Sequence, residues 1–354
     1  MDSLSQISLG AAISVAVMGR RTAVWKAAVW GGLAGTLPDT DVFIDFGDPI
    51  INMVRHRAES HALLYLTLLA PILAWGIAKL QGQPELWRRW ALAMWLVLFT
   101  HPLLDVMTVY GTRLLMPFTD HPFGVGSIFI IDPLYTLPII IGLFGALLFR
   151  SSQGLRWNQI GLALSSLYLV WGVFIQSHMF EIAEKSLQAS NIKAERILVT
   201  PTAFNSILWR VVAMTPDYYY EGYSSLLDDN SEIKWLQYPR CPDLIQTHIH
   251  NPNVKAIAQF SHGFYNLRQQ NDRLIVTDLR MGQEPYYFFA FDAGQASTPS
   301  THTKELAVNV GQRPNLSTAL PWLWARLGGV VTPLPDALAT SSSSGNHQLV
   351  ACGG

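Results

Sequence analysis

The stretch Trp90–Val109, WALAMWLVLFTHPLLDVMTV, places one histidine and one aspartate in a long apolar run. A helix rises about 1.5 Å per residue, so this run is long enough to cross a hydrocarbon core of about 30 Å. His101 and Asp105 lie on one face of such a helix, about one turn apart. Ionisable groups within a membrane segment are costly and usually line a polar cavity or pair with each other. The stretch therefore predicts a membrane helix that carries a functional site.

The composition of the whole chain is that of a membrane protein. Of the 354 residues, 50% are hydrophobic and 14% are charged, against roughly a quarter charged in ordinary soluble domains. The formal net charge of -1 offers no basic surface, so nucleic acid is not an expected partner. Cys241 and Cys352 lie far apart without CxxC spacing, which suggests neither a zinc ribbon nor a disulfide framework.

Apolar stretches are concentrated before residue 178. Membrane spans are predicted at His61–Leu80, Trp90–Val109, Ile128–Phe149 and Trp157–Ile175, with a helical hairpin formed by Ile7–Met18 and Thr22–Leu37. Short loops rich in Lys and Arg stay in the cytoplasm. Three short joints between the apolar stretches are rich in basic residues and are predicted to be cytoplasmic. They contain Arg20, Arg21 and Lys26, then Lys79, Arg88 and Arg89, then Arg150 and Arg156. The alternate joints, 39–57 and 111–127, are therefore predicted to be extracytoplasmic, although Arg55, Arg57 and Arg113 count against the rule there.

The second half of the chain has ordinary charge density. Runs of β-branched and aromatic residues predict strands at Ile207–Met214, Arg273–Asp278 and Tyr286–Phe291. The expected fold is an α-helical transmembrane bundle, residues 1–177, followed by a smaller soluble α+β domain, residues 178–314, on the extracytoplasmic side. Residues 315–354 are predicted to form an amphipathic segment and a disordered tail.

Histidines and aspartates gather at the predicted outer ends of the membrane segments. Imidazole and carboxylate groups bind zinc, manganese or magnesium, and no cysteine takes part. The predicted metal ligands are Asp39, His56, His61, His101 and Asp105. Zinc is the first expectation for the divalent ion, with manganese and magnesium as alternatives.

Three further residues are predicted to act in catalysis. A divalent metal lowers the pKa of bound water, and a spare carboxylate can accept the proton, which makes hydrolysis the simplest chemistry. Asp41 and Asp132 are the candidate carboxylates, although either could instead be a ligand. Arg57 is the candidate for stabilising developing negative charge. The chain has no Gly-x-Ser-x-Gly elbow, P-loop or dinucleotide glycine pattern, so other hydrolase classes and dehydrogenases lack support.

Other interpretations of the same residues stay open. His101 and Asp105 could be a buried pair that only ties helices together, and Asp39-x-Asp41 could be a solvated loop after a helix stop. Ser60 could merely cap the helix that starts near His61. For the whole protein, the alternatives to an enzyme are a metal or proton transporter and a non-catalytic scaffold stabilised by metal.

Several motifs in order resemble the bacterial membrane-bound metal-dependent hydrolase family typified by YdjM. They are Leu37–Asp41, His56-Arg57 with Ser60-His61, Thr100–Asp105, Tyr110–Thr112 and Asp132–Thr136. The resemblance covers most of residues 1–175 and implies metal-dependent hydrolysis at the inner membrane by the matched histidines and aspartates.

This chain departs from the family pattern at two places. Gln6 stands where many members have a histidine, which removes a possible ligand, and Ala58-Glu59 replaces a glycine. More remotely, the family resembles zinc-dependent phospholipase C. That likeness implies a lipid-linked or envelope phosphoester as substrate and the lipid bilayer as partner.

Overall fold

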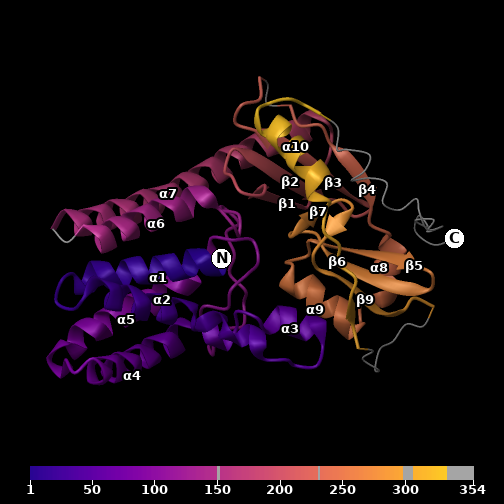
Figure 1. The fold of residues 1–354 in the computed structure, drawn as a ribbon. Helices are drawn as coiled ribbons and strands as arrows, with labels where there is room; N and C mark the ends of the chain where they lie inside the picture. Colours follow the sequence, from indigo (N-terminus) through magenta and orange to yellow (C-terminus); the bar gives the residue numbers. More distant parts are fainter. Residues whose placement is uncertain (150–151, 230–231, 298–305, 333–354) are drawn as a thin grey trace. The chain divides into compact units, whose positions relative to one another are not determined.

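The computed structural model describes residues 1–149, 152–229, 232–297 and 306–332. It shows a helical N-terminal half followed by a C-terminal β-sheet domain (Figure 1). The chain divides into two units. Unit 1 comprises Met1–Ile44, Arg55–Ile175 and Ala203–Ser206, and unit 2 comprises Asp45–Val54, Gln176–Thr202 and Ile207–Gly354. Arg150, Cys352 and nearly all of the predicted disordered tail lie outside the described residues.

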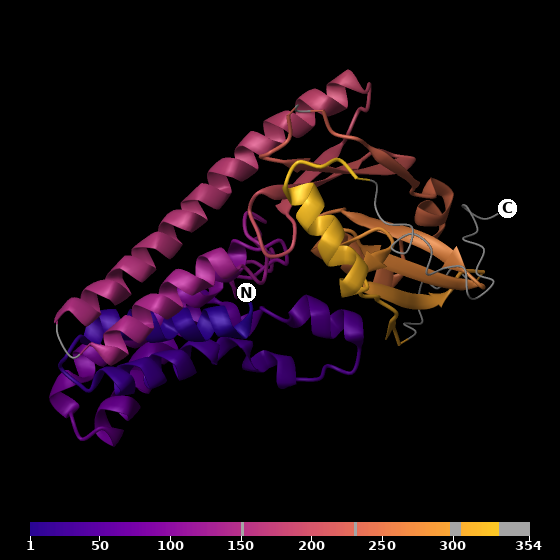
Figure 2. The same ribbon diagram turned by 45° about the horizontal axis from the view of Figure 1, so that its top comes forward.

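Each apolar stretch predicted from the sequence forms a helix. The helices of the first half are α1 (Ser3–Met18), α2 (Val24–Thr36), α4 (Leu63–Leu80), α5 (Trp87–Val106), α6 (Pro133–Leu148) and α7 (Ser152–Ala189). Shorter elements are η1 (Pro38–Phe43), α3 (Pro49–Arg55), η2 (Glu59–His61) and η3 (Pro84–Leu86). In Figures 1 and 2, α1, α2, α4, α5 and α6 lie side by side.

Two helix ends differ from the predictions for local reasons. Helix α6 begins at Pro133 and not at Ile128, because the carboxylate of Asp132 caps it by accepting a hydrogen bond from the amide of Leu134 (3.0 Å). Helix α7 continues to Ala189, well beyond the predicted end at Ile175. Of the described helices, α4 and α7 are long and apolar enough to cross a membrane, while α1 and α6 are apolar but shorter. Length and composition thus identify fewer membrane spans than predicted.

Small residues let α1 and α2 approach closely. A Cβ atom added at Gly31 would lie 2.3 Å from the carbonyl oxygen of Gly10, and one at Gly35 would lie 2.7 Å from the carbonyl oxygen of Gln6. Any side chain at these positions would force the two backbones apart. The packing fixes the end of α2, which leads directly into η1.

The C-terminal domain contains two antiparallel four-stranded sheets. Their strand orders are β1-β2-β3-β4 and β10-β9-β6-β5. The strands of the first sheet are β1 (Arg196–Pro201), β2 (Leu208–Met214), β3 (Tyr218–Ser225) and β4 (Leu236–Pro239). Those of the second are β5 (Tyr265–Gln270), β6 (Arg273–Asp278), β9 (Ala290–Gln295) and β10 (Val308–Asn309). Three helices accompany them, namely α8 (Pro242–His248), α9 (Pro252–Phe260) and α10 (Leu316–Leu327).

The strand predictions hold for β2 and β6 but not for the third segment. The predicted strand Tyr286–Phe291 is wrong as a single element, because the chain changes partner within it. Its first residues form β8 (Tyr286–Tyr287), which pairs with β7 (Gly282–Gln283), and β9 then pairs with β6. Helix α10 packs on this domain through Trp322, which lies in a cluster with Leu208 and Tyr223.

Candidate metal centre

The candidate site lies at one end of the helices of unit 1. Asp39 follows the C-terminus of α2, His61 precedes the N-terminus of α4, and His101 and Asp105 occupy the last turns of α5. Helices α4 and α5 are consecutive and antiparallel, so the start of one and the end of the other meet. The alternating direction of the chain therefore brings together residues that are distant in sequence.

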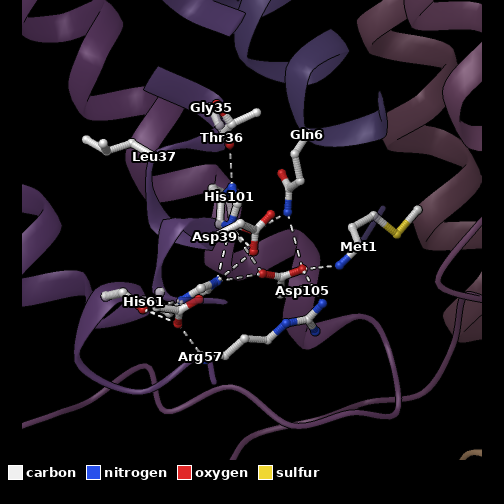
Figure 3. A network of polar contacts seen from close by, with 12 residues as sticks. Met1, Gln6, Gly35, Thr36, Leu37, Asp39, Arg57, His61, His101 and Asp105 are labelled. Atoms are coloured by element: carbon white, nitrogen blue, oxygen red, sulfur yellow. Dashed lines mark hydrogen bonds and ion pairs between the residues drawn. The ribbon is translucent and has the colours of Figure 1, made fainter. Parts of the chain in front are cut away.

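Four side chains converge on one point in Figure 3: Asp39, His61, His101 and Asp105. The Nε2 atoms of His61 and His101 are 3.2 Å apart. The Asp105 Oδ2 atom lies 3.2 Å from the first and 3.3 Å from the second, and Asp39 Oδ1 lies 3.4 Å and 3.5 Å from them. Bonds of about 2.0 to 2.2 Å separate the ligand atoms of a tetrahedral zinc ion by roughly 3.3 to 3.6 Å. These five separations match those around a single ion, and all four ligand atoms lie within 4.8 Å of one another.

The hydrogen bond at the other nitrogen sets the tautomer of His101. Its Nδ1 atom lies 2.7 Å from the carbonyl oxygen of Gly35. A carbonyl only accepts, so Nδ1 carries a hydrogen, and Nε2 is the nitrogen that can bind a metal once it is deprotonated. Backbone support of this kind is the usual way in which a metal-binding histidine is oriented.

The side chains of Ser60 and Asp41 orient His61 so that its Nε2 atom, like that of His101, faces the cluster. The hydroxyl of Ser60 donates to Asp41 Oδ2 (2.6 Å) and lies 2.8 Å from His61 Nδ1. Because the hydroxyl hydrogen goes to the carboxylate, Ser60 accepts from Nδ1, which leaves the lone pair of His61 at Nε2. The Nε2 atoms of the two imidazoles thus face each other and two carboxylates.

Asp105 is held by its other oxygen. Oδ1 contacts the amino group of Met1, the guanidinium of Arg57 (3.2 Å) and the amide nitrogen of Gln6 (3.2 Å). Oδ2 is buried and has no hydrogen-bond donor among the described residues. An acceptor left without a donor in the interior is costly. Its position opposite the histidine nitrogens is that of a metal ligand.

The four groups together have the chemistry of a cation site. The side chains of His61, His101 and Asp105 are 0%, 1% and 0% exposed, and Asp39 is 21% exposed. Lone pairs and negative charges at such short separations repel each other strongly unless positive charge lies between them. Two imidazoles and two carboxylates are ligands that suit zinc or manganese. Of these four side chains, that of Asp39 is the one in substantial contact with solvent.

Asp39, in the short helix η1 and outside the long apolar helices, has a lowered pKa. Burial would raise the pKa of this carboxyl group, but the imidazoles of His101 and His61 beside it outweigh burial, and the pKa falls below its usual value. Asp39 therefore stays ionised at neutral pH, as a metal ligand must.

The structure does not bring His56 or Asp41 into the group of four. His56 Nδ1 lies 2.8 Å from Asp41 Oδ1, and Asp41 Oδ2 also accepts a hydrogen bond from the amide of Arg57 (3.0 Å). The ring of His56 stands edge-on to that of His61, with centroids 6.1 Å apart. Asp41 therefore contacts His56, the backbone amide of Arg57 and Ser60, and it supports the candidate ligand His61 through Ser60.

The other two predicted catalytic residues have different surroundings. Arg57 is buried with a left-handed backbone (φ 65°), and its guanidinium lies over the ring of Tyr110 and beside Asp105. Asp132 is not in the group of four. It caps α6 and accepts a hydrogen bond from the hydroxyl of Tyr168 (2.8 Å). Burial raises the pKa of Asp132.

Sequence reasoning missed some of the groups that support the site. The carbonyl of Gly35 and the amino group of Met1 belong to the backbone, so no side-chain pattern signals them. Ser60 was considered only as a helix cap, although it bridges Asp41 and His61. Gln6, noted as a departure from the family pattern, contacts both Asp105 and the carbonyl of His101.

The fold and the site define a helical protein with apolar helices and a buried cluster of two histidines and two aspartates that could hold a metal ion. Residues 1–179 match the family described as YdjM inner membrane protein, and the chain belongs to this family. The resemblance seen in the sequence motifs is thereby confirmed.

A second comparison reaches beyond the family region. The chain is 23% identical over 276 residues to the uncharacterized protein YfhP of Bacillus subtilis (strain 168), covering 74% of this chain and 80% of that protein. Since this stretch is longer than residues 1–179, the similarity extends into the C-terminal domain. No solved structure matches the chain.

Proposed function

We propose that this protein is a metal-dependent hydrolase of the bacterial inner membrane, acting on an ester or phosphoester of a lipid-linked or envelope substrate. The observation that carries the proposal is the convergence of Asp39, His61, His101 and Asp105 at separations that fit one ion. Zinc is the preferred ion for this ligand set. When bound, a divalent ion supplies water activation and polarisation of the scissile group.

The surrounding residues have separate roles in this proposal. Asp39 lies at the side of the cluster that solvent reaches, so substrate approaches there. Arg57 holds Asp105 in place and adds positive charge beside the site, where negative charge develops during ester hydrolysis. Asp41 orients His56 through Nδ1 and His61 through Ser60, so a change at Asp41 disturbs both rings.

The membrane arrangement is part of the proposal. Helices α1, α2, α5 and α6 cross or enter the bilayer together with α4 and α7, as a bundle. The joints with Arg20, Arg21, Lys79, Arg88 and Arg89 face the cytoplasm. The metal site then lies at the extracytoplasmic end, and the β-sheet domain is extracytoplasmic.

A transport function has less support. A proton or metal pathway needs ionisable groups through the depth of the bundle. Among the described residues of unit 1, the buried acidic, basic and histidine side chains are Arg57, His61, His101, Asp105 and Asp132. All of them lie at the same end of the helices, so the described polar groups form a site and not a path.

The test uses the full chain purified in detergent. Elemental analysis should find bound zinc or manganese, and hydrolysis of a phospholipid, phosphomonoester or amide substrate should stop with chelator and return with metal. His101→Ala should lose metal and activity, while the control His250→Ala, an exposed histidine of the C-terminal domain, keeps both. Activity that ignores chelator would refute the proposal. Bound metal without hydrolysis of any substrate, together with lower stability after chelation, would favour the scaffold interpretation.

A further inference from the structure

Two segments of unit 1 expose large apolar side chains, the end of η1 with Ile44 and the turn that contains Leu115 and Phe118. Phe43 is 86% exposed and Phe118 is 81% exposed. Val42 and Ile44 beside the first, and Leu115 beside the second, are exposed as well. We call these five residues the apolar rim. Exposed aromatic residues grouped in this way indicate a binding surface.

Hydrogen bonds fix both segments to the stretch that carries His61. Asp41 accepts from the amide of Arg57 and the hydroxyl of Ser60, and Val42 and Phe43 follow at once. The amide of Arg113 donates to the carbonyl of Arg57 (2.9 Å), and the amide of Leu63 donates to the carbonyl of Leu114 (3.0 Å). Both parts of the rim are therefore tied by neighbouring residues to the segment 57–63.

The metal ligand and the rim share one short helix. Asp39 and Phe43 both belong to η1, where the rise of about 2 Å per residue separates them by roughly 8 Å along the axis. Asp39 is turned to the cluster, while Phe43 is almost fully exposed. A molecule with an apolar chain against Phe43 can thus place a polar group at Asp39.

The helices that precede η1 and follow the segment 57–63 in the chain also have exposed apolar faces. On α2, Trp25, Val29 and Leu33 are exposed at intervals of four residues and form one stripe that runs towards η1. On α4, Leu68, Ile72 and Trp75 are exposed at helical spacing. Because the chain belongs to an inner membrane family, hydrocarbon is the partner that suits both these stripes and the rim.

We propose that the apolar rim contacts the acyl chains of the bilayer and that the substrate is a membrane lipid, which reaches Asp39 from within the membrane. The substrate part of this inference rests on the proposed hydrolase function. The lipid contact rests on the apolar rim alone. The scissile ester or phosphoester lies at the cluster while the acyl chain lies against Phe43 and Phe118.

The lipid contact is tested without any enzyme assay. Benzoylphenylalanine is placed singly at Phe43 and at Phe118 of the full chain, which is reconstituted in phosphatidylethanolamine and phosphatidylglycerol bilayers and irradiated. Mass spectrometry should find lipid adducts at both positions, as at Phe144, an exposed residue of α6. Phe288, an exposed residue of the β-sheet domain, serves as the negative control. Adducts at the rim no more frequent than at Phe288, or adducts to protein alone, would overturn the inference.

The substrate class is tested by changing the rim and the substrate together. Phe43→Ser with Phe118→Ser should raise KM for a long-chain phospholipid about tenfold or more, because two large apolar contacts are lost. The kcat/KM for a short-chain, water-soluble ester or phosphoester and the bound metal should stay unchanged. Equal effects on long and short substrates would refute a lipid substrate while leaving the hydrolase intact. If the unchanged chain hydrolyses neither the long-chain nor the short-chain substrate, the proposed hydrolase function is refuted. The adduct experiment then still decides whether the rim contacts lipid.

Discussion

At the scale of single residues, the site depends on groups that do not themselves face the ion. Ser60 illustrates this, since its hydroxyl connects the carboxylate of Asp41 to His61 Nδ1 and so selects the tautomer with a free Nε2. Such supporting partners fix the tautomer and the ring orientation of a ligand and so tune metal affinity. A residue interpreted from sequence as a helix cap is therefore part of the centre.

Replacing Ser60 by alanine should weaken metal binding by about 10- to 100-fold, because His61 loses the partner that fixes its ring. Competition with a chromophoric chelator measures the affinity. Ser166→Ala is the matched control, since among the described residues that hydroxyl donates to the carbonyl of Leu162 in its own helix. Equal affinities of Ser60→Ala and the unchanged chain would show that Ser60 does not orient His61.

At the scale of elements, the helix pair α1 and α2 sets the position of the Gly35 carbonyl. Gly10, Gly31 and Gly35 bring the two backbones into contact, and the carbonyl at the end of α2 then reaches His101 Nδ1. The close approach therefore serves both packing and the orientation of a candidate ligand.

Gly31→Ala should destabilise the helical unit by about 1 to 3 kcal/mol, because the new Cβ overpacks the contact between α1 and α2. It should also weaken metal binding by moving the Gly35 carbonyl. Thermal unfolding in detergent and metal competition are the measurements. Gly76→Ala in α4 is the control, since no described residue beyond its own stretch of helix lies within 4 Å of a Cβ there. A Gly31→Ala variant as stable as Gly76→Ala would contradict the packing argument.

At the scale of the whole molecule, the two units have separate apolar cores. A cluster with Val15, Met94 and Leu98 fills unit 1, and one with Val212, Tyr219 and Leu279 fills unit 2. Metal bound at Asp39, His61, His101 and Asp105 therefore stabilises unit 1 directly.

Removing metal from the full chain should lower the stability of unit 1, by about 2.7 kcal/mol for free metal that was at 100 times its Kd. Hydrogen exchange resolves the two units, and faster exchange is expected in α4 and α5 with little change in β2 and β6. His101→Ala, which binds no metal in this proposal, should show no response to chelator. An equal response of both units would argue against a site confined to unit 1.

The sequence by itself determined the helices of the first half, since long apolar runs force a helix in any apolar surrounding. It also supplied the candidate ligands, because each lies in or beside such a run. Only the tertiary structure decided which of them meet. His56 and His61 are chemically alike and five residues apart, yet the turn at Arg57, with its positive φ, leaves one beside Asp41 and the other beside His101. A metal site is a set of distances between remote residues, and these distances follow from how the helices pack and not from the residues of any one segment.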